Sequence, residues 1–184
     1  MRIVGGTFRG RTIVAPKGMA TRPTTDRTRE SLFNIIEHGY GGCEGTRVLD
    51  LFAGSGAMGL EALSRGAVQV LFVDDAAAAR GAIRENIEAL GQQGTTKIFR
   101  RDATNMGAPN AKMGSSYALV FCDPPYGKGL AERAITSARE GGWLTQDALI
   151  LVEEINGAFK VPEGFEEVDR RAFGETEVTF LRLA

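Results

Sequence analysis

The sequence predicts an α/β protein with an open, mainly parallel sheet. Short apolar runs alternate with segments of helical periodicity between residues 47 and 155. One of these runs leads into a glycine turn, VLDLFAGSGAMG at 48–59, as a buried strand does at the ligand-binding crossover of such a sheet. Two apolar runs near the end of the chain are joined only by Phe173-Gly174, which predicts an antiparallel hairpin. We therefore expect seven strands, the last one antiparallel, with helices on both faces.

The same alternation places each element of the main domain. The predicted strands cover residues 47–52, 69–74, 96–101, 117–122, 149–154, 165–171 and 175–183. The predicted helices cover residues 57–65, 76–90 and 130–140. With 184 residues, the chain has the length of one domain, or of one domain with an arm.

A separate extension is expected at the N-terminus. Two β-like runs within residues 2–15 surround Gly-Thr-Phe-Arg-Gly and predict a small hairpin. After a loop, a helix is expected through residues 27–39, with Thr25 or Asp26 as its cap. The glycine-rich stretch after this helix marks a boundary. The predicted parts are the extension at 1–45 and the main domain at 46–184.

Charge is unevenly divided between these parts. Residues 1–29 hold seven basic residues against one acid, a net charge of +6. The rest of the chain must carry −7, because the whole has a net charge of −1. A basic segment on an acidic body indicates an anionic partner held by one region, or else a solvated arm without a partner.

Other features exclude several classes of protein. No apolar stretch has the length of a transmembrane helix. The first residues, MRIVGGTFRGR, lack the apolar core of a signal peptide, so we expect a cytoplasmic protein. Cys43 and Cys122 lie far apart and outside any C-x-x-C pair, which predicts reduced thiols and no zinc site. No metal is expected, and the single histidine, His38, is expected at the surface near a helix end.

The glycine turn fits two classes of ligand. Gly54 to Gly59 spell G-x-G-x-x-G, and Asp74 follows at about the offset of an acid that binds ribose hydroxyls. These facts are compatible with a nicotinamide dinucleotide. They are equally compatible with a nucleoside ligand that lacks a pyrophosphate, such as S-adenosylmethionine.

Asp50 favours the second class. It lies inside the first strand, four residues before Gly54, where dinucleotide folds usually have an apolar residue or glycine. A carboxylate there suits an ammonium or a sulfonium, because burial without such a partner costs several kcal/mol or leads to protonation. Asp50 could instead cap N–H groups of its own turn, and the two roles do not exclude one another.

The motif Asp123-Pro124-Pro125-Tyr126 follows the fourth strand, at the carboxyl edge where ligands bind. The prolines remove two N–H donors and leave carbonyl oxygens free for an amine. Asp123 adds an acceptor, and Tyr126 offers a flat face for stacking a base. Alone, the motif is also compatible with a turn without function. Together with the upstream D-x-F-x-G-x-G, it indicates a pocket for an aromatic exocyclic amine.

At this point the chain resembles a known family. DLFAGSG followed by DPPY is similar to class I S-adenosylmethionine-dependent N-methyltransferases. RIVGGTFRGR, RPTTDRTRESLFNII and VLDLFAGSGAMGLEALSRGA resemble the bacterial 16S rRNA guanine-N2 methyltransferase family, from Arg2 to about Val152. The family usually has Glu at the end of the second strand and another acid two residues later. Here these positions are Asp74 and Ala76, with Asp75 between them.

The resemblance implies a Rossmann-like fold and transfer of a methyl group from S-adenosylmethionine to N2 of a guanine. The substrate would be 16S rRNA, within the small ribosomal subunit or its assembly intermediate. The implied catalytic residues are Asp123, Pro124, Pro125 and Tyr126. The implied cofactor-binding residues are Asp50, Phe52, Gly54, Gly56, Asp74, Asp102 and Ala103. Asp102 is compatible with a second role, as the cap of a following helix.

RNA binding is assigned to the basic extension. The expected phosphate contacts are Arg2, Arg9, Arg11, Arg22, Arg27 and Arg29. Arg22 and Arg29 are the first choices, because they flank a turn expected near the mouth of the pocket.

Three other functions remain open from the sequence. An N6-adenine methyltransferase would use DPPY in the same way, and nucleoside analysis would distinguish it. A nicotinamide-dependent dehydrogenase would bind that cofactor and not S-adenosylmethionine. A binding or assembly factor with an inactive cofactor site is disfavoured, because both motifs are intact.

Overall fold

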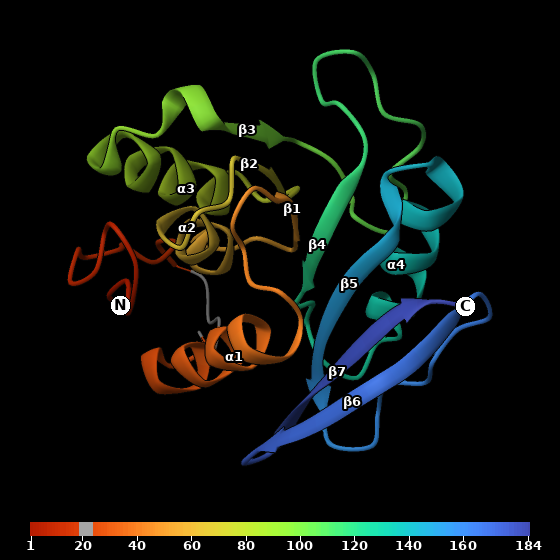
Figure 1. The fold of residues 1–184 in the computed structure, drawn as a ribbon. Coiled ribbons are helices and arrows are strands. Elements are labelled where there is room, and N and C mark those ends of the chain that lie inside the picture. The colour runs from red at the N-terminus through yellow and green to blue at the C-terminus, as the bar shows by residue number, and fades with distance from the viewer. Residues whose placement is uncertain (19–23) are drawn as a thin grey trace.

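The computed structural model describes residues 1–18 and 24–184 and contains a seven-stranded sheet of order β3-β2-β1-β4-β5-β7-β6 (Figure 1). The strands are β1 Arg47–Leu51, β2 Gln69–Val73, β3 Thr96–Phe99, β4 Tyr117–Cys122, β5 Leu144–Ile155, β6 Phe165–Phe173 and β7 Thr176–Leu183. The helices are α1 Asp26–Gly39, α2 Ala57–Ser64, α3 Ala77–Leu90 and α4 Leu130–Gly141, with a short 3₁₀ turn, η1 Gln93–Thr95. Strands β1 to β5 pair in parallel, and β7 is antiparallel to β5 and β6. The predicted fold class is confirmed.

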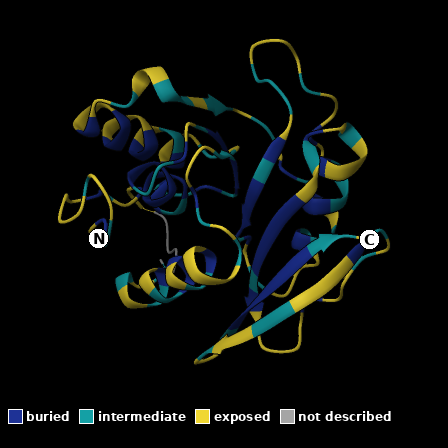
Figure 2. Cartoon of the chain, in the orientation of Figure 1, coloured by how far each residue is buried: buried dark blue, intermediate teal, exposed yellow. Residues whose placement is uncertain are grey.

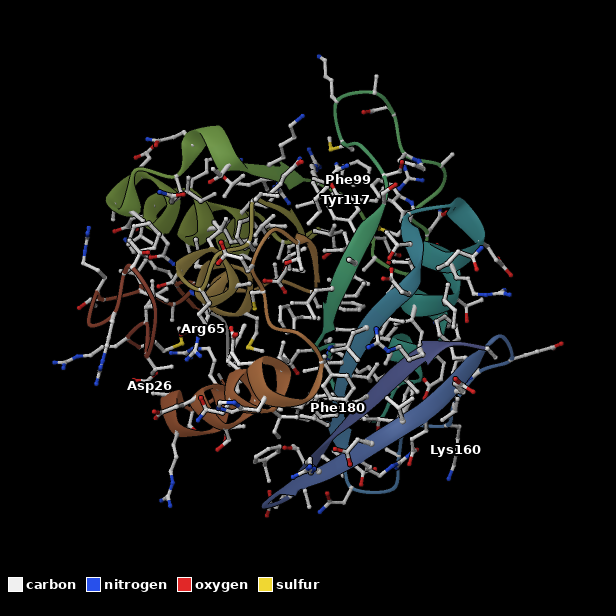
Figure 3. All side chains as sticks on the ribbon, in the orientation of Figure 1. Asp26, Arg65, Phe99, Tyr117, Lys160 and Phe180 are labelled. Carbon is white, nitrogen blue, oxygen red and sulfur yellow. The ribbon has the colours of Figure 1, made fainter. Side chains whose placement is uncertain are left out.

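One strand begins earlier than predicted. β5 starts at Leu144, five residues before the predicted Leu149. Leu144 pairs with Tyr117, and the register shifts before the next pair, Leu119 with Leu149. The polar residues between these two pairs hide the apolar pattern on which the prediction relied. Phe99 and Tyr117, labelled in Figure 3, lie near Trp143 at this end of the sheet, with ring centroids 6.0 and 6.3 Å from that of the tryptophan.

The sheet separates two hydrophobic clusters, and its inner strands are mostly buried, whereas the edge strand β6 is mostly exposed (Figure 2). One face is covered by α1, α2, α3 and the first residues of the chain. Their buried side chains include Ile3, Phe33, Leu60 and Ile83. The other face is covered by α4 and by the segments before and after it in the chain. The N-terminal extension therefore shares a core with the main domain.

The predicted N-terminal hairpin is reduced to an isolated antiparallel bridge between Arg2 and Thr12. The reason is that the polar groups of this segment bond to α2 as well as to one another. The backbone N–H groups of Val4 and Gly5 donate to the Glu61 carboxylate, each at 3.0 Å. The extension is therefore both folded on itself and fastened to α2.

Helix α1 begins where the sequence predicts. Thr25 is its N-cap, and the Thr25 hydroxyl oxygen accepts a hydrogen bond from the Thr28 amide at 3.1 Å. The cap places Thr24, the residue before it, next to the end of β5.

Across residues 1–18 and 24–184, no helix is long and apolar enough to cross a bilayer. The same residues contain no group of three His, Cys, Asp or Glu side chains arranged to hold a metal ion. Cys43 and Cys122 are buried free cysteines, and loss of water around Cys43 raises the pKa of its thiol to about 12.

Candidate active site

The glycine turn between β1 and α2 is held in a left-handed conformation. Phe52, Gly54 and Gly56 have φ values of 55°, 59° and 81°. A Cβ atom built on Gly54 would meet nothing within 4 Å, so glycine is needed there for its dihedral angles and open space lies beside it. The backbone at the end of β1 can therefore come close to a ligand.

The third glycine of the motif has a packing role. A Cβ atom on Gly59 would lie 2.5 Å from the Phe72 ring and 2.7 Å from a Val70 methyl group, both on β2. Glycine at this position lets α2 approach the sheet closely. It also brings the Gly59 amide to the Asp50 carboxylate, to which it donates at 3.0 Å.

Asp50 is almost fully buried, with 3% of its surface exposed. The pKa of its carboxyl is raised to about 8, mainly because the group is withdrawn from water. The hydrogen bond from Gly59 lowers this pKa, and the nearby Asp74 raises it. The structure therefore contains the backbone-capping role that the sequence left open. Because no described Lys or Arg pairs with this carboxyl, the site is suited to a cation as well.

Asp74 directly follows β2 and is tied to the glycine turn. One carboxylate oxygen accepts from the Gly54 amide and the other from the Ala76 amide, each at 3.0 Å. These two bonds fix the side chain, and each oxygen keeps a further lone pair for a donor such as a hydroxyl. Asp74, which is shorter than Glu, is thus attached directly to the turn.

Asp102 and Ala103 follow β3 on the same edge. The Asp102 carboxylate accepts from the amide and the hydroxyl of Thr104, at 2.9 and 2.7 Å, and these bonds lower its pKa. It therefore closes a turn. The alternative prediction, that Asp102 caps a helix, is wrong, because no helix begins there. The Ala103 side chain is buried in the core, which leaves its backbone as the part that can face a ligand.

The DPPY turn leaves the sheet beside the end of β5. Cys122 pairs with Val152, so Asp123 and Glu153 are the next residues on two adjacent parallel strands. Withdrawal from water and the nearby Glu153 charge raise the pKa of Asp123 well above its ordinary value. Pro124 is buried in the turn.

Two carboxylates at the end of β5 hold this turn, and sequence reasoning missed both. The Tyr126 hydroxyl donates to Glu153 at 2.5 Å, and the Gly127 amide donates to Glu154 at 3.0 Å. The available signal was the sequence ALILVEE, an apolar strand that ends in two acids at the edge where the other strands place theirs. Burial and the surrounding carboxylates raise the pKa of the Tyr126 hydroxyl.

The carboxyl edge thus gathers carboxyl groups from adjacent strands. Asp50 lies near the end of β1, and Asp123 directly follows β4. Glu153 and Glu154 lie near the end of β5. Within the described ranges, none of these four side chains forms an ion pair with Lys or Arg. The arrangement suits a ligand that brings positive charge and N–H donors.

The arginines of the extension do not share one environment. Arg2, Arg9, Arg11 and Arg27 are exposed. Arg11 also donates to the Ala89 carbonyl oxygen at 2.5 Å. Arg22 lies outside the described residues. Exposed guanidinium groups are compatible with the predicted phosphate contacts.

Arg29 is the exception and requires a correction. Its side chain is fully buried, and its guanidinium donates to Glu61 at 3.2 Å, to Asp26 at 2.9 Å and to the carbonyl oxygens of Arg2 and Thr24. No phosphate can reach a group enclosed in this way. Helical periodicity was the available signal, because Arg29 lies on the face of α1 that also buries Leu32, Phe33 and Ile36.

Comparison with known proteins agrees with this geometry. Residues 1–182 match the model of a family described as Conserved hypothetical protein 95. The chain is 39% identical over 169 residues to ribosomal RNA small subunit methyltransferase D of Escherichia coli K12, covering 88% of this chain and 79% of that one. It is 35% identical over 155 residues to the protein of the same name from Haemophilus influenzae, covering 83% and 78%.

Solved structures give the same picture. The yhhF protein of Escherichia coli has a TM-score of 0.82 and 33% identity, covering 100% of this chain and 97% of that one. TrmN of Thermus thermophilus, at 22% identity, shares the fold with a TM-score of 0.67 over 85% of this chain and 48% of its own. The resemblance inferred from the sequence motifs is confirmed. The chain belongs to the family described as Conserved hypothetical protein 95 and is a homologue of ribosomal RNA small subunit methyltransferase D.

Proposed function

We propose that this protein transfers a methyl group from S-adenosylmethionine to the exocyclic N2 amine of a guanine in 16S rRNA. The observation that carries the proposal is a pair of carboxylates, Asp50 in β1 and Asp123 directly after the adjacent β4, that have no cationic partner among residues 1–18 and 24–184 and lie beside a bare glycine turn. Such a site suits a cationic cofactor next to an amine. The names and identities of the homologues support the same activity.

The residues present fit this cofactor. S-adenosylmethionine, when bound, supplies a methyl group on a positively charged sulfur. Asp50 and the backbone from Phe52 to Gly56 would hold its methionine portion, where open space lies beside Gly54. Asp74, fixed by two backbone amides, would accept from the ribose hydroxyls. The Asp102 carboxylate and the Ala103 backbone would face the adenine.

The DPPY turn would bind the substrate base. The Asp123 carboxylate and the Pro124 carbonyl oxygen would accept from the amine, and the Tyr126 ring would stack on a base flipped out of its helix. Holding both reactants in line supplies about 7–11 kcal/mol of barrier reduction. We assign Asp123 to positioning first and to accepting the released proton second. Amine donors and a nearby cation favour its ionised form despite the raised pKa.

The N-terminal extension, residues 1–45, would bind the RNA and residues 46–184 would carry the catalysis. Exposed Arg2, Arg9, Arg11 and Arg27 would contact phosphates, and Arg22 remains a prediction. The partner would be the small ribosomal subunit or its assembly intermediate, which would place the protein in the cytoplasm. No metal or membrane takes part in this proposal.

The test is methylation of 16S rRNA and of small subunits from cells that lack the gene, with labelled S-adenosylmethionine. Nucleoside analysis should find the label in N2-methylguanosine. Label in N6-methyladenosine would instead support the alternative that DPPY leaves open. Absence of transfer to either nucleoside would contradict the proposal. Calorimetry should detect binding of S-adenosylmethionine and none of NAD, which would exclude the dehydrogenase alternative.

A further inference from the structure

Glu153 occupies a junction between two regions that are distant in sequence. It lies at the carboxyl end of β5, one residue beyond the pair that joins Val152 to Cys122, and is therefore beside Asp123. Its two carboxylate oxygens have different partners. One accepts from the Tyr126 hydroxyl at 2.5 Å, and the other accepts from the Thr24 hydroxyl at 3.1 Å.

The bond to Tyr126 acts on the part of the DPPY turn that would stack on the base. A tyrosine ring with a free hydroxyl can turn about two side-chain bonds, whereas a ring whose hydroxyl is held is restricted in both. The neighbouring Glu154 holds the next residue, because it accepts from the Gly127 amide at 3.0 Å. Two successive residues of β5 thus fix the ring and the backbone of one turn.

The bond to Thr24 reaches the other region. Thr24 precedes the N-cap of α1, and its carbonyl oxygen accepts from the buried Arg29 guanidinium. The same guanidinium also donates to Glu61 on α2. The Glu61 carboxylate in turn accepts from the amides of Val4 and Gly5, near the start of the chain. A continuous series of hydrogen bonds therefore runs from the basic extension to the DPPY turn.

We propose that Glu153 is a positioning residue that fixes the Tyr126 ring over the substrate base and links it, through Thr24, to the RNA-binding extension. The inference rests on the proposed function. It adds a residue that touches neither reactant and acts through Tyr126 on one side and Thr24 on the other. RNA held by the extension then meets a pocket whose stacking ring is already set.

Steady-state kinetics of single and double variants test this inference. Tyr126→Phe keeps the ring and removes the hydroxyl, and Glu153→Ala removes its acceptor. Each should lower kcat about tenfold and leave KM for S-adenosylmethionine within about twofold, since loss of orientation affects the reacting geometry. The double variant should lose no more than Glu153→Ala alone, because both changes remove one interaction. Thr24→Val should instead raise KM for RNA about threefold or more, with kcat within about twofold.

Glu153→Gln gives a readout that a purely structural role would not move. The groups that act on the Asp123 carboxyl are Glu153, Tyr126, Asp50 and Glu154. Glutamine keeps one acceptor but removes the charge that raises the pKa of Asp123. This variant should recover most of the kcat lost in Glu153→Ala. It should also shift the acidic limb of the pH profile of kcat/KM to lower pH.

Amide hydrogen exchange tests the inference without any activity. Glu153→Ala should speed exchange in residues 123–129 and 24–28, whereas Thr24→Val should affect only the second segment. Asp147→Ala is the matched control, because Asp147 is an exposed carboxylate at the opposite end of the same strand. It should change neither segment.

Two results would overturn the inference. The first is a Glu153→Ala protein with kcat and exchange like the parent. The second is a double variant in which the losses of Glu153→Ala and Tyr126→Phe multiply. A parent protein without methyl transfer would contradict the proposed function alone, and the exchange experiment would then decide on Glu153 by itself.

Discussion

Two sets of buried or half-buried carboxylates in this protein differ in what neutralises them. Glu61, on α2, is fully buried and accepts from the guanidinium groups of Arg29 and Arg65, at 3.2 and 2.9 Å, as well as from two backbone amides. Arg65 and Asp26, labelled in Figure 3, lie on the side of the molecule where the extension meets α1 and α2. Asp50 and Asp123 have no such partners among the described residues, and their pKa values are raised.

The difference separates carboxylates that are neutralised within the fold from carboxylates that lack a cationic partner among the described residues. A buried carboxylate with two arginines has its neutralising partners built into the fold, so removing it leaves an unpaired cation. A buried carboxylate without a cation costs the folded state free energy until a ligand supplies the charge. The first kind fastens the extension to the main domain, and the second kind lies at the carboxyl edge of the sheet.

The largest effect is expected at Glu61. Glu61→Gln should lower the free energy of unfolding by about 3–5 kcal/mol, because the buried Arg29 guanidinium loses its counter-charge. Urea denaturation followed by circular dichroism measures it. Glu88→Gln, an exposed site on α3, should change stability by less than about 0.5 kcal/mol. A loss at Glu61 as small as the one at Glu88 would contradict the structural role of this pair.

Asp123→Ala should lower activity without lowering stability, in contrast to Glu61→Gln, which should lower stability. Loss of the amine acceptor should lower methyl transfer about 10²–10³-fold, the range found when one preorganised hydrogen-bonding group is removed from an active site. The midpoint of unfolding should stay the same or rise, because a carboxyl without a cationic partner is removed. Full methyl transfer by this variant would exclude Asp123 from the site.

Asp50 should make cofactor affinity depend on pH. Its folded-state pKa of about 8 lies above the ordinary value of 3.8, so the protein without a cation keeps this proton up to about pH 8. A bound cation displaces the proton, so affinity for S-adenosylmethionine should rise about tenfold from pH 6 to pH 7 and level off above pH 8. Calorimetry at several pH values measures this rise.

Asp50→Asn is the matched variant for the pH experiment. It should bind the cofactor more weakly at pH 8 and remove most of the rise with pH. In the parent without ligand, the same shift predicts that stability falls as pH increases from about 4 to 8, since the unfolded chain releases this proton first. An unchanged slope in Asp50→Asn would assign the titration to another group, such as Asp123.

The smallest effects are expected at exposed arginines. Arg27→Ala should weaken RNA binding a few-fold and reduce the slope of log affinity against log salt by about one, because one phosphate contact is lost. Arg171→Ala, at an exposed arginine of β6 outside the extension, is the control and should leave the slope unchanged. If the parent and Arg27→Ala had equal slopes of log affinity against log salt, Arg27 would not contact the RNA.

Local rules explain most of what the sequence predicted correctly. The alternation of apolar runs gave the strands, and the left-handed angles at Gly54 and Gly56 are those that glycine allows without cost. The cap at Thr25 follows from the short-range geometry of one hydroxyl and one amide. These features depend on residues within a few positions of one another, so a single pass along the chain finds them.

The errors arise where distant segments meet. Arg29 looks like its exposed neighbour Arg27 until α1 packs against α2, where Glu61 accepts its charge. The early start of β5 depends on a register with β4, and the short extent of the N-terminal hairpin, a single antiparallel bridge, accompanies bonds to α2. None of these facts is encoded in local spacing.

By itself, the sequence determined the fold class, the family and the motifs at the carboxyl edge, because periodicity and turn chemistry act over short distances. Tertiary structure alone decided which charges are neutralised inside the protein and which remain uncompensated at the site. It placed Glu153 between Tyr126 and Thr24, which are 27 and 129 positions away in the chain. The physical reason is that the energy of a buried charge depends on what surrounds it in space, and those neighbours come from segments far apart in sequence.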